Sequence, residues 1–129
     1  MSYNFFAKSN IHFGNGAVSV LPDLLGKYGL GKIMLVYDGG VKAAGIAEKV
    51  IAQIEKAKTP YVIFDGVIPN PTNEVVENAA KLAKQEKVDG FVAVGGGSSI
   101  DTAKAVNVLM TNPGSIGEYG GMNMVKNPC

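Results

Sequence analysis

The chain has 129 residues, 47% of them hydrophobic and 18% charged, which is enough for one domain with a real hydrophobic core. Twelve lysine and arginine residues against eleven aspartate and glutamate residues leave a net charge of +1, which excludes the strongly basic surface of a protein that binds nucleic acid or anionic membranes. The lone Cys129 and the lone His12 exclude a disulfide scaffold, a cysteine-rich metal site and a multi-histidine metal site within these residues.

The sequence patterns that predict the first two elements are less regular than those that follow. Residues 4–13 predict a short strand that adds to a sheet edge or forms a hairpin. Residues 18–28 predict a helix in which Pro22 fits only the first turn, because proline lacks the N–H that a helix interior requires. We find no signal peptide and no apolar stretch of about eighteen residues that would span a membrane, and therefore expect a cytoplasmic protein.

Three short apolar runs predict the strands of a sheet. They are residues 33–37 (IMLVY), 61–64 (YVIF) and 88–94 (VDGFVAV). Each run ends in a turn that contains glycine. Runs this apolar are typical of strands that are buried on both faces, as in a parallel sheet.

Amphipathic stretches follow the three strands. Apolar positions recur every three or four residues over 41–58, 72–87 and 98–110, which predicts three helices, and Thr72 is placed to cap the second. Residues 110–129 are rich in glycine, asparagine and proline and predict a loop-rich tail with about one helical turn. This alternation predicts the α/β class, as a Rossmann-like, doubly wound and mainly parallel sheet.

Residues 95–98 (GGGS) follow the last strand and open a helix. Glycines let the backbone approach a ligand closely, and the N–H groups at a helix start favour an anion such as a pyrophosphate. Ile100 stands where the common dinucleotide fingerprint has its third glycine, and the segment has no P-loop lysine. From the residues alone, a tight turn closed by a capping box between Ser98 and Asp101 remains open as the alternative.

Asp38, Asn70 and Asp101 are further candidate binding residues. Asp38 ends the first strong strand, where a carboxylate can accept both hydroxyls of an adenosine ribose and repel a 2′-phosphate, although a turn aspartate is the alternative. Prolines on both sides fix the backbone of Asn70, which also fits a rigid loop. Asp101 precedes Lys104 by three residues, a spacing that also suits a surface ion pair. The chain shows no nucleophile–histidine–acid set for catalysis.

Three motifs together resemble one family. They are FDGVIPNPT (residues 64–72), GGGSSIDTAKA (95–105) and NPGSIGEYGG (112–121), and the opening IHFGNGAVSVLPDLL is similar to the FGxGxxxxL start of the same family. In this order the motifs resemble the N-terminal domain of the iron-containing (group III) alcohol dehydrogenases, which include lactaldehyde reductase, 1,3-propanediol dehydrogenase and butanol dehydrogenases. The resemblance covers nearly the whole chain.

The resemblance implies a role for each candidate residue. The matching turn binds the cofactor pyrophosphate through Gly96, Gly97 and Ser98, and Gly95 completes it. Asp38 matches the residue that contacts the adenosine ribose in NAD-dependent members, which favours NAD over NADP, with NADP still possible. Asn70 matches the asparagine beside the cofactor. Asp101 matches an acid at the cofactor cleft.

The chain departs from the family in what is missing. The family continues to another strand, a threonine-rich loop that contacts the cofactor, and a helical second domain whose aspartate and three histidines hold iron. None of these segments is present, so we expect no catalytic residue and no metal ligand in this chain. We therefore expect residues 1–129 to form a single N-terminal dinucleotide-binding domain, with residues 110–129 leading toward the continuation. Such a domain would be inactive alone.

The resemblance also implies the partners. The intact protein is expected to be a homo-oligomeric, NAD(P)-dependent and iron-dependent dehydrogenase or reductase of small primary alcohols, diols or aldehydes. Two alternatives stay open. One is a relative of glycerol dehydrogenase and dehydroquinate synthase, which share a related GGG-x-x-x-D plan and usually use zinc. The other is a non-catalytic module that binds a nucleotide or another anion.

Overall fold

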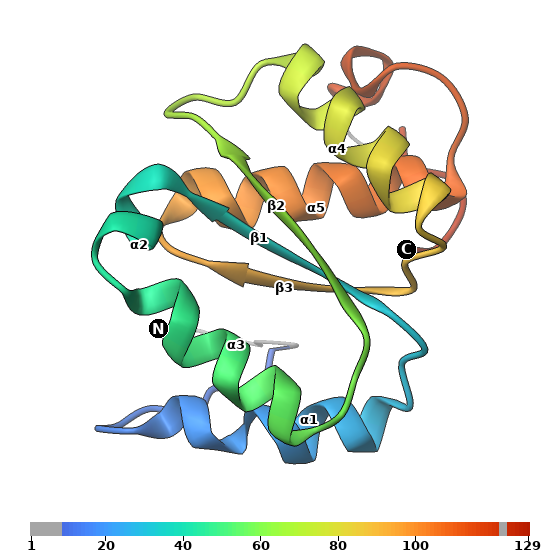
Figure 1. Cartoon of the computed structure of the whole chain (residues 1–129). Coiled ribbons are helices and arrows are strands. Elements are labelled where there is room, and N and C mark those ends of the chain that lie inside the picture. The colour runs from blue at the N-terminus through green and yellow to red at the C-terminus, as the bar shows by residue number, and fades with distance from the viewer. Residues whose placement is uncertain (1–8, 122–123) are drawn as a thin grey trace, which may run out of the picture.

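The computed structural model describes residues 9–121 and 124–129, in which three parallel strands form a sheet between two layers of helices (Figure 1). The sheet order is β2-β1-β3, with bounds β1 (Ile33–Asp38), β2 (Tyr61–Val67) and β3 (Gly90–Val94). One face of the sheet is covered by α1 (Leu21–Tyr28) and α3 (Ile46–Lys56), and the other by α4 (Asn73–Gln85) and α5 (Gly97–Thr111). Helices on both faces of a parallel sheet confirm the predicted α/β, doubly wound class.

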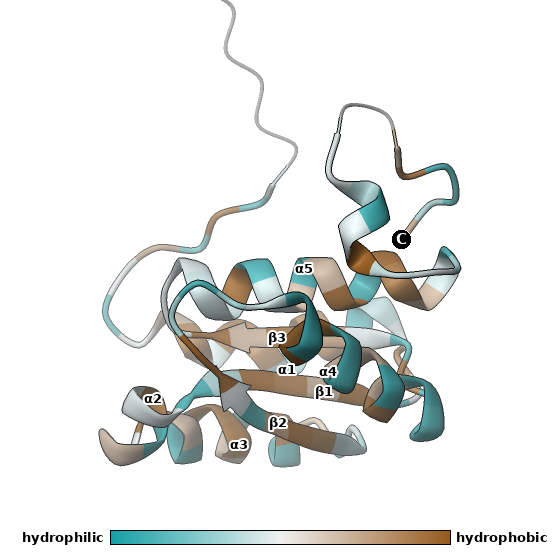
Figure 2. Cartoon of the chain, turned by 90° about the horizontal axis from the view of Figure 1, so that it is seen from above, coloured by the Kyte–Doolittle hydropathy of each residue, from teal (hydrophilic) through white to brown (hydrophobic). Residues whose placement is uncertain are grey.

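The central strand β1 forms the middle of both hydrophobic cores. Ile33, Leu35 and Tyr37 pack with α1 and α3, whereas Met34 and Val36 pack with α4 and α5. All five are buried, since successive side chains of a strand point to opposite faces. The outer strands β2 and β3 are only partly buried, so the prediction of strands buried on both faces holds for β1 alone. Figure 2 shows the strands as a mainly hydrophobic layer between the helices.

The prediction of one helix over residues 41–58 is wrong. The segment contains α2 (Gly39–Ala43) and α3, separated at Gly45, whose backbone is left-handed with φ 67°. Glycine adopts this conformation without the steric cost that a Cβ imposes, so the chain turns there. The apolar positions stay periodic across the break because Val41 and Val50 pack into the same core.

Other differences lie at the ends of elements. A short helix η1 (Ala17–Val20) precedes α1, and Pro22 occupies the first turn of α1 as predicted. Strand β3 begins at Gly90 rather than 88, because the Val88 N–H donates to the Ala83 carbonyl and closes the end of α4. Of the strand predicted over 4–13, residues 4–8 lie outside the described residues and residues 9–13 form no strand.

Helices α4 and η2 agree with the sequence. Thr72 caps α4, since its Oγ1 accepts a hydrogen bond from the Val75 N–H at 3.4 Å. The tail contains the one predicted helical turn, η2 (Ile116–Tyr119). Buried Asn112 anchors the tail, because its Nδ2 donates to the Asn127 carbonyl at 3.1 Å. Within the described ranges, no helix is both long and apolar enough to cross a membrane.

Candidate functional site

The three strands end at the same edge of the sheet, where most of the candidate residues lie. Figure 1 shows the arrowheads of the strands on the side where α2 and the start of α5 lie. In the strand register, Asp38 pairs with Val67 of β2, and Tyr37 pairs with Val94 of β3. Asp38 is therefore level with the end of β2 and with Gly95, the first residue after β3. Ligands of open parallel sheets bind outside this carboxyl edge.

Asp38 uses only one of its two carboxylate oxygens within the fold. It is the N-cap of α2, and its Oδ1 accepts a hydrogen bond from the Val41 N–H at 2.8 Å. Its Oδ2 has no hydrogen bond to the described residues. The side chain is half-buried, so its position is restrained while the second oxygen stays available for donors from a ligand.

The turn after β3 needs glycine at its first position and leaves open space at the next two. Gly95 has φ 132°, and a Cβ added there would lie 2.9 Å from Ser99 Oγ and 3.3 Å from Val41 Cγ2. Side chains rarely adopt this backbone conformation, so Gly95 is required by the fold itself. A Cβ at Gly96 or Gly97 would meet nothing within 4 Å, so a ligand can approach the backbone at these two residues.

The N-terminus of α5 has no side-chain cap. Gly96 is the N-cap and offers no side chain, and the first turn contains no acidic residue. The alternative capping box between Ser98 and Asp101 does not form, because Ser98 lies inside the first turn rather than at the N-cap. Uncapped N–H groups and the positive end of the helix dipole together favour an anion at this point.

Ser99 is a further residue of this turn that the sequence did not single out. Its side chain is fully buried, and its Oγ has no hydrogen-bond partner among the described residues. A buried hydroxyl without a partner costs about 1–3 kcal/mol, so native proteins usually satisfy such groups. The Oγ packs against Gly95, where an added Cβ would lie 2.9 Å away, so the buried Ser99 side chain is one reason that the turn requires glycine at this position. Only its place directly after the GGGS motif could have pointed to it.

Asn70 and Asp101 line the same cavity, although they are far apart in the sequence. The cavity has a volume of about 330 Å³ and lies between the start of α4, the first half of α5 and η2; its lining residues are Asn70, Pro71, Asn73, Val76, Asp101, Thr102, Ala105 and Ile116. Asn70 has φ 51°, a left-handed backbone that asparagine tolerates better than most residues. The ion pair between Asp101 and Lys104 is absent from the described residues.

An ion pair that the sequence did not predict lies between α2 and β2. Lys42 Nζ and Asp65 Oδ2 are 2.7 Å apart. The hydrogen bond from Lys42 lowers the pKa of Asp65, and Asp65 raises the pKa of Lys42 in turn. Burial, followed by the negative charge of Asp65, raises the pKa of Tyr37. Because the two partners are distant in sequence and lie on different elements, no local pattern signals the pair.

The described residues do not fit a metal ion. Within residues 9–121 and 124–129, no three histidine, cysteine, aspartate or glutamate side chains lie close enough together to hold one. His12 is exposed and lines a mainly apolar cavity of about 380 Å³ with residues of η1, α1 and β3.

Comparison with known proteins gives a consistent set of relatives. A family model described as "Iron-containing alcohol dehydrogenase" matches residues 8–128. The chain is 39% identical to a choline dehydrogenase of Bacillus subtilis (strain 168) and 36% identical to an NAD-dependent methanol dehydrogenase of Bacillus methanolicus, over 91% and 97% of its own length. The crystal structure of NADH-dependent butanol dehydrogenase A from Thermotoga maritima aligns over 89% of the chain, with a TM-score of 0.82 and 34% identity.

These relatives are much longer than the present chain. The aligned region spans 29% of the choline dehydrogenase, 33% of the methanol dehydrogenase and 29% of the butanol dehydrogenase chain. The match therefore covers the elements around the glycine turn and leaves most of each relative unmatched.

Proposed function

Because the chain belongs to the iron-containing alcohol dehydrogenase family, we propose that it is the cofactor-binding part of an NAD(P)-dependent, iron-dependent alcohol dehydrogenase or aldehyde reductase. The substrates we propose are small primary alcohols, diols and the matching aldehydes. One observation carries the cofactor role. A carboxylate with one free oxygen, Asp38, lies level with an uncapped glycine turn at the carboxyl edge of the sheet.

The described residues fit a dinucleotide. We propose that the free Oδ2 of Asp38 accepts hydrogen bonds from the hydroxyls of the adenosine ribose. The N–H groups of residues 95–98 and the dipole of α5 hold the pyrophosphate, with Gly96 and Gly97 allowing close approach. Asn70 and Asp101, which line one cavity, lie beside the cofactor.

The protein and the cofactor divide the chemistry between them. The bound nicotinamide would accept the hydride from the alcohol carbon, or return it to the aldehyde, while this chain binds and orients the dinucleotide. NAD is favoured over NADP because the Asp38 carboxylate would repel a 2′-phosphate. Two dehydrogenases similar to this chain carry NAD or NADH in their names, which supports the same preference.

The proposal extends to the organisation of the protein. We propose that residues 1–129 form a single N-terminal dinucleotide-binding domain whose tail, residues 110–129, leads toward the rest of a cytoplasmic homo-oligomer. Because the described residues contain no metal site, we expect this chain alone to oxidise no alcohol. Measurable oxidation of ethanol or propanediol by the pure chain, with iron and NAD added, would contradict this expectation.

The cofactor role is tested by titrating the chain with NADH and with NADPH. We expect NADH to bind more tightly, and the substitution Asp38→Asn to reduce the preference about tenfold, because removing the charge is worth about 1.4 kcal/mol. Asparagine remains a good N-cap, so α2 should stay intact. The matched control is Asp89→Asn, an aspartate that also accepts backbone hydrogen bonds but lies at the opposite end of the sheet. An unchanged preference in Asp38→Asn, or no binding of either nucleotide, would overturn the proposal.

A further inference from the structure

We propose that the Lys42–Asp65 ion pair is a second determinant of cofactor choice, because Asp65 holds the Lys42 ammonium away from the 2′-phosphate of NADP. This inference rests on the proposed function, since it concerns the same ribose site at Asp38. The Lys42–Asp65 pair would discriminate against NADP without contacting NAD, the cofactor that we propose binds.

Lys42 lies one helical turn from Asp38 along α2. Asp38 caps α2, and Lys42 follows it by four residues, which places both residues on the same side of the helix about one turn apart. The lysine side chain is exposed and flexible, with 59% of its surface accessible to solvent. A phosphate on the ribose that Asp38 contacts would therefore lie within reach of a released Lys42 side chain.

Asp65 keeps the Lys42 side chain from that position. Its Nζ is 2.7 Å from Oδ2 of Asp65 on β2, and this hydrogen bond raises the lysine pKa. Asp65 lies where the register between β1 and β2 shifts, as Val36 pairs with Phe64 but Asp38 pairs with Val67. The extra residue in β2 places the carboxylate beside α2. The ammonium is thus already paired before any cofactor binds.

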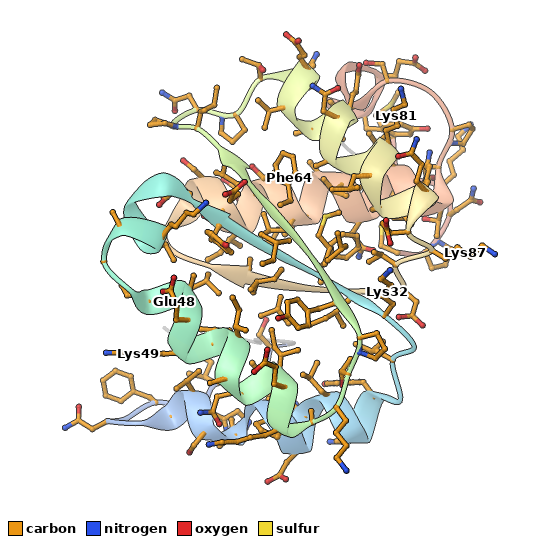
Figure 3. All side chains as sticks on the ribbon, in the orientation of Figure 1. Lys32, Glu48, Lys49, Phe64, Lys81 and Lys87 are labelled. Atoms are coloured by element: carbon orange, nitrogen blue, oxygen red, sulfur yellow. The ribbon has the colours of Figure 1, made fainter. Side chains whose placement is uncertain are left out.

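The surroundings of Lys42 are acidic. The carboxylates of Asp65 and Glu48 both act on the ammonium of Lys42, and Asp65, followed by the weaker effect of Glu48, raises the pKa of Lys42. Figure 3 shows Glu48 directed from α3 toward α2. A 2′-phosphate, with a charge of about −2, would meet these carboxylates and an ammonium that Asp65 already neutralises.

The test measures the dissociation constants of NADH and NADPH for three variants of the chain. We expect Asp65→Asn to tighten NADPH binding about fivefold, the upper range for an exposed ion pair, and to change NADH binding less than twofold. The double variant Asp65→Asn/Lys42→Met should lose this gain in NADPH affinity, because it has no Lys42 ammonium to contact the 2′-phosphate. Lys42→Met alone should weaken NADPH about twofold, since it leaves the Asp65 carboxylate unpaired.

The control is the matching pair at the other end of the sheet, Lys32 and Glu86. Glu86→Gln removes one negative charge, as Asp65→Asn does, and should leave the preference unchanged. If the double variant keeps the gain, Asp65 acts through its own charge and the role of Lys42 is overturned. If Asp65→Asn leaves the preference unchanged while Asp38→Asn reduces it, this inference fails and the proposed function stands. If the wild-type chain binds neither nucleotide, both fail.

Discussion

The two ends of the sheet carry the same kinds of groups but use them differently. At the amino end, Asp89 accepts hydrogen bonds with both carboxylate oxygens, from the Gly31 N–H at 2.8 Å and the Lys32 N–H at 3.0 Å. At the carboxyl end, Asp38 accepts one backbone hydrogen bond, and its other oxygen has no hydrogen bond to the described part of the chain. A carboxylate whose two oxygens both accept hydrogen bonds within the protein has a structural role. A carboxylate with one oxygen left over can also bind a ligand.

The glycines at the two ends show the same contrast. A Cβ at Gly90, at the start of β3, would lie 2.5 Å from Leu30 Cδ1, so the protein fills this space with its own side chain. A Cβ at Gly96 or Gly97 would meet nothing within 4 Å. Figure 3 shows Lys32, whose ammonium pairs with Glu86, on the side opposite the strand arrowheads. The amino end is thus closed by the chain's own side chain at Gly90, whereas the carboxyl end is open at Gly96 and Gly97.

The largest expected effect distinguishes two glycines of the same turn. Gly95→Ala should destabilise the chain by about 3 kcal/mol, because alanine is strained at φ 132° and its Cβ would press on Ser99 Oγ. Gly97→Ala should leave the free energy of unfolding unchanged or raise it slightly, yet weaken NADH binding about tenfold by occupying the open space. Urea unfolding followed by circular dichroism measures the first effect, and titration with NADH the second. Equal loss of stability in both variants would contradict this division.

The second prediction compares the loss of stability when each of the two aspartates, Asp89 and Asp38, is replaced by asparagine. Asp89→Asn should lower the free energy of unfolding by about 1 kcal/mol, since one of its two acceptors becomes a donor at an exposed site. Asp38→Asn should cost less than about 0.5 kcal/mol, because asparagine caps a helix as well as aspartate does. Urea unfolding of both variants at neutral pH checks the order. A larger loss of unfolding free energy in Asp38→Asn than in Asp89→Asn would show that the Asp38 carboxylate is also needed for the stability of the fold.

The smallest effect is a pH dependence at the amino end. Hydrogen bonds from the Lys32 and Gly31 N–H groups lower the pKa of Asp89 below its ordinary value. A lowered pKa in the folded state stabilises the fold above the unfolded pKa, about 3.9, and this contribution is lost as the pH falls through the lower folded value. The stability difference between wild type and Asp89→Asn should therefore be constant above about pH 5 and shrink below pH 4. A difference that stays constant down to pH 3 would contradict the assigned cause.

Much of the fold could be predicted because its determinants are local. The apolar run of β1 and the periodic apolar positions of α4 reflect burial that each segment shows in its own sequence. The break at Gly45 was missed because α2 and α3 pack on the same core and preserve the periodicity. The burial of β2 and β3 was overestimated because the order of strands in the sheet is not a local property.

The candidate site was predicted where a motif carries it and missed where contacts are long-range. Asp38, Asn70 and the glycine turn stand out in the sequence, but the buried Ser99 hydroxyl and the Lys42–Asp65 pair depend on how elements pack. Two segments with the same Ser-x-x-acid spacing show why spacing alone does not predict a capping box. Ser98 and Asp101 share the capping-box spacing with Ser115 and Glu118, yet only the second pair forms the box, because Gly96 takes the N-cap position of α5.

The most direct test of the open carboxyl end is an NMR titration of the isotopically labelled chain with NADH, following every backbone amide. We predict that the largest chemical-shift changes fall on residues 95–99 and on Val41, whose N–H contacts Asp38, while the amides of Gly31 and Lys32 at the closed end stay unchanged. Changes centred on Gly31 and Lys32, or no changes at millimolar NADH, would contradict the assignment of the carboxyl end as the nucleotide site.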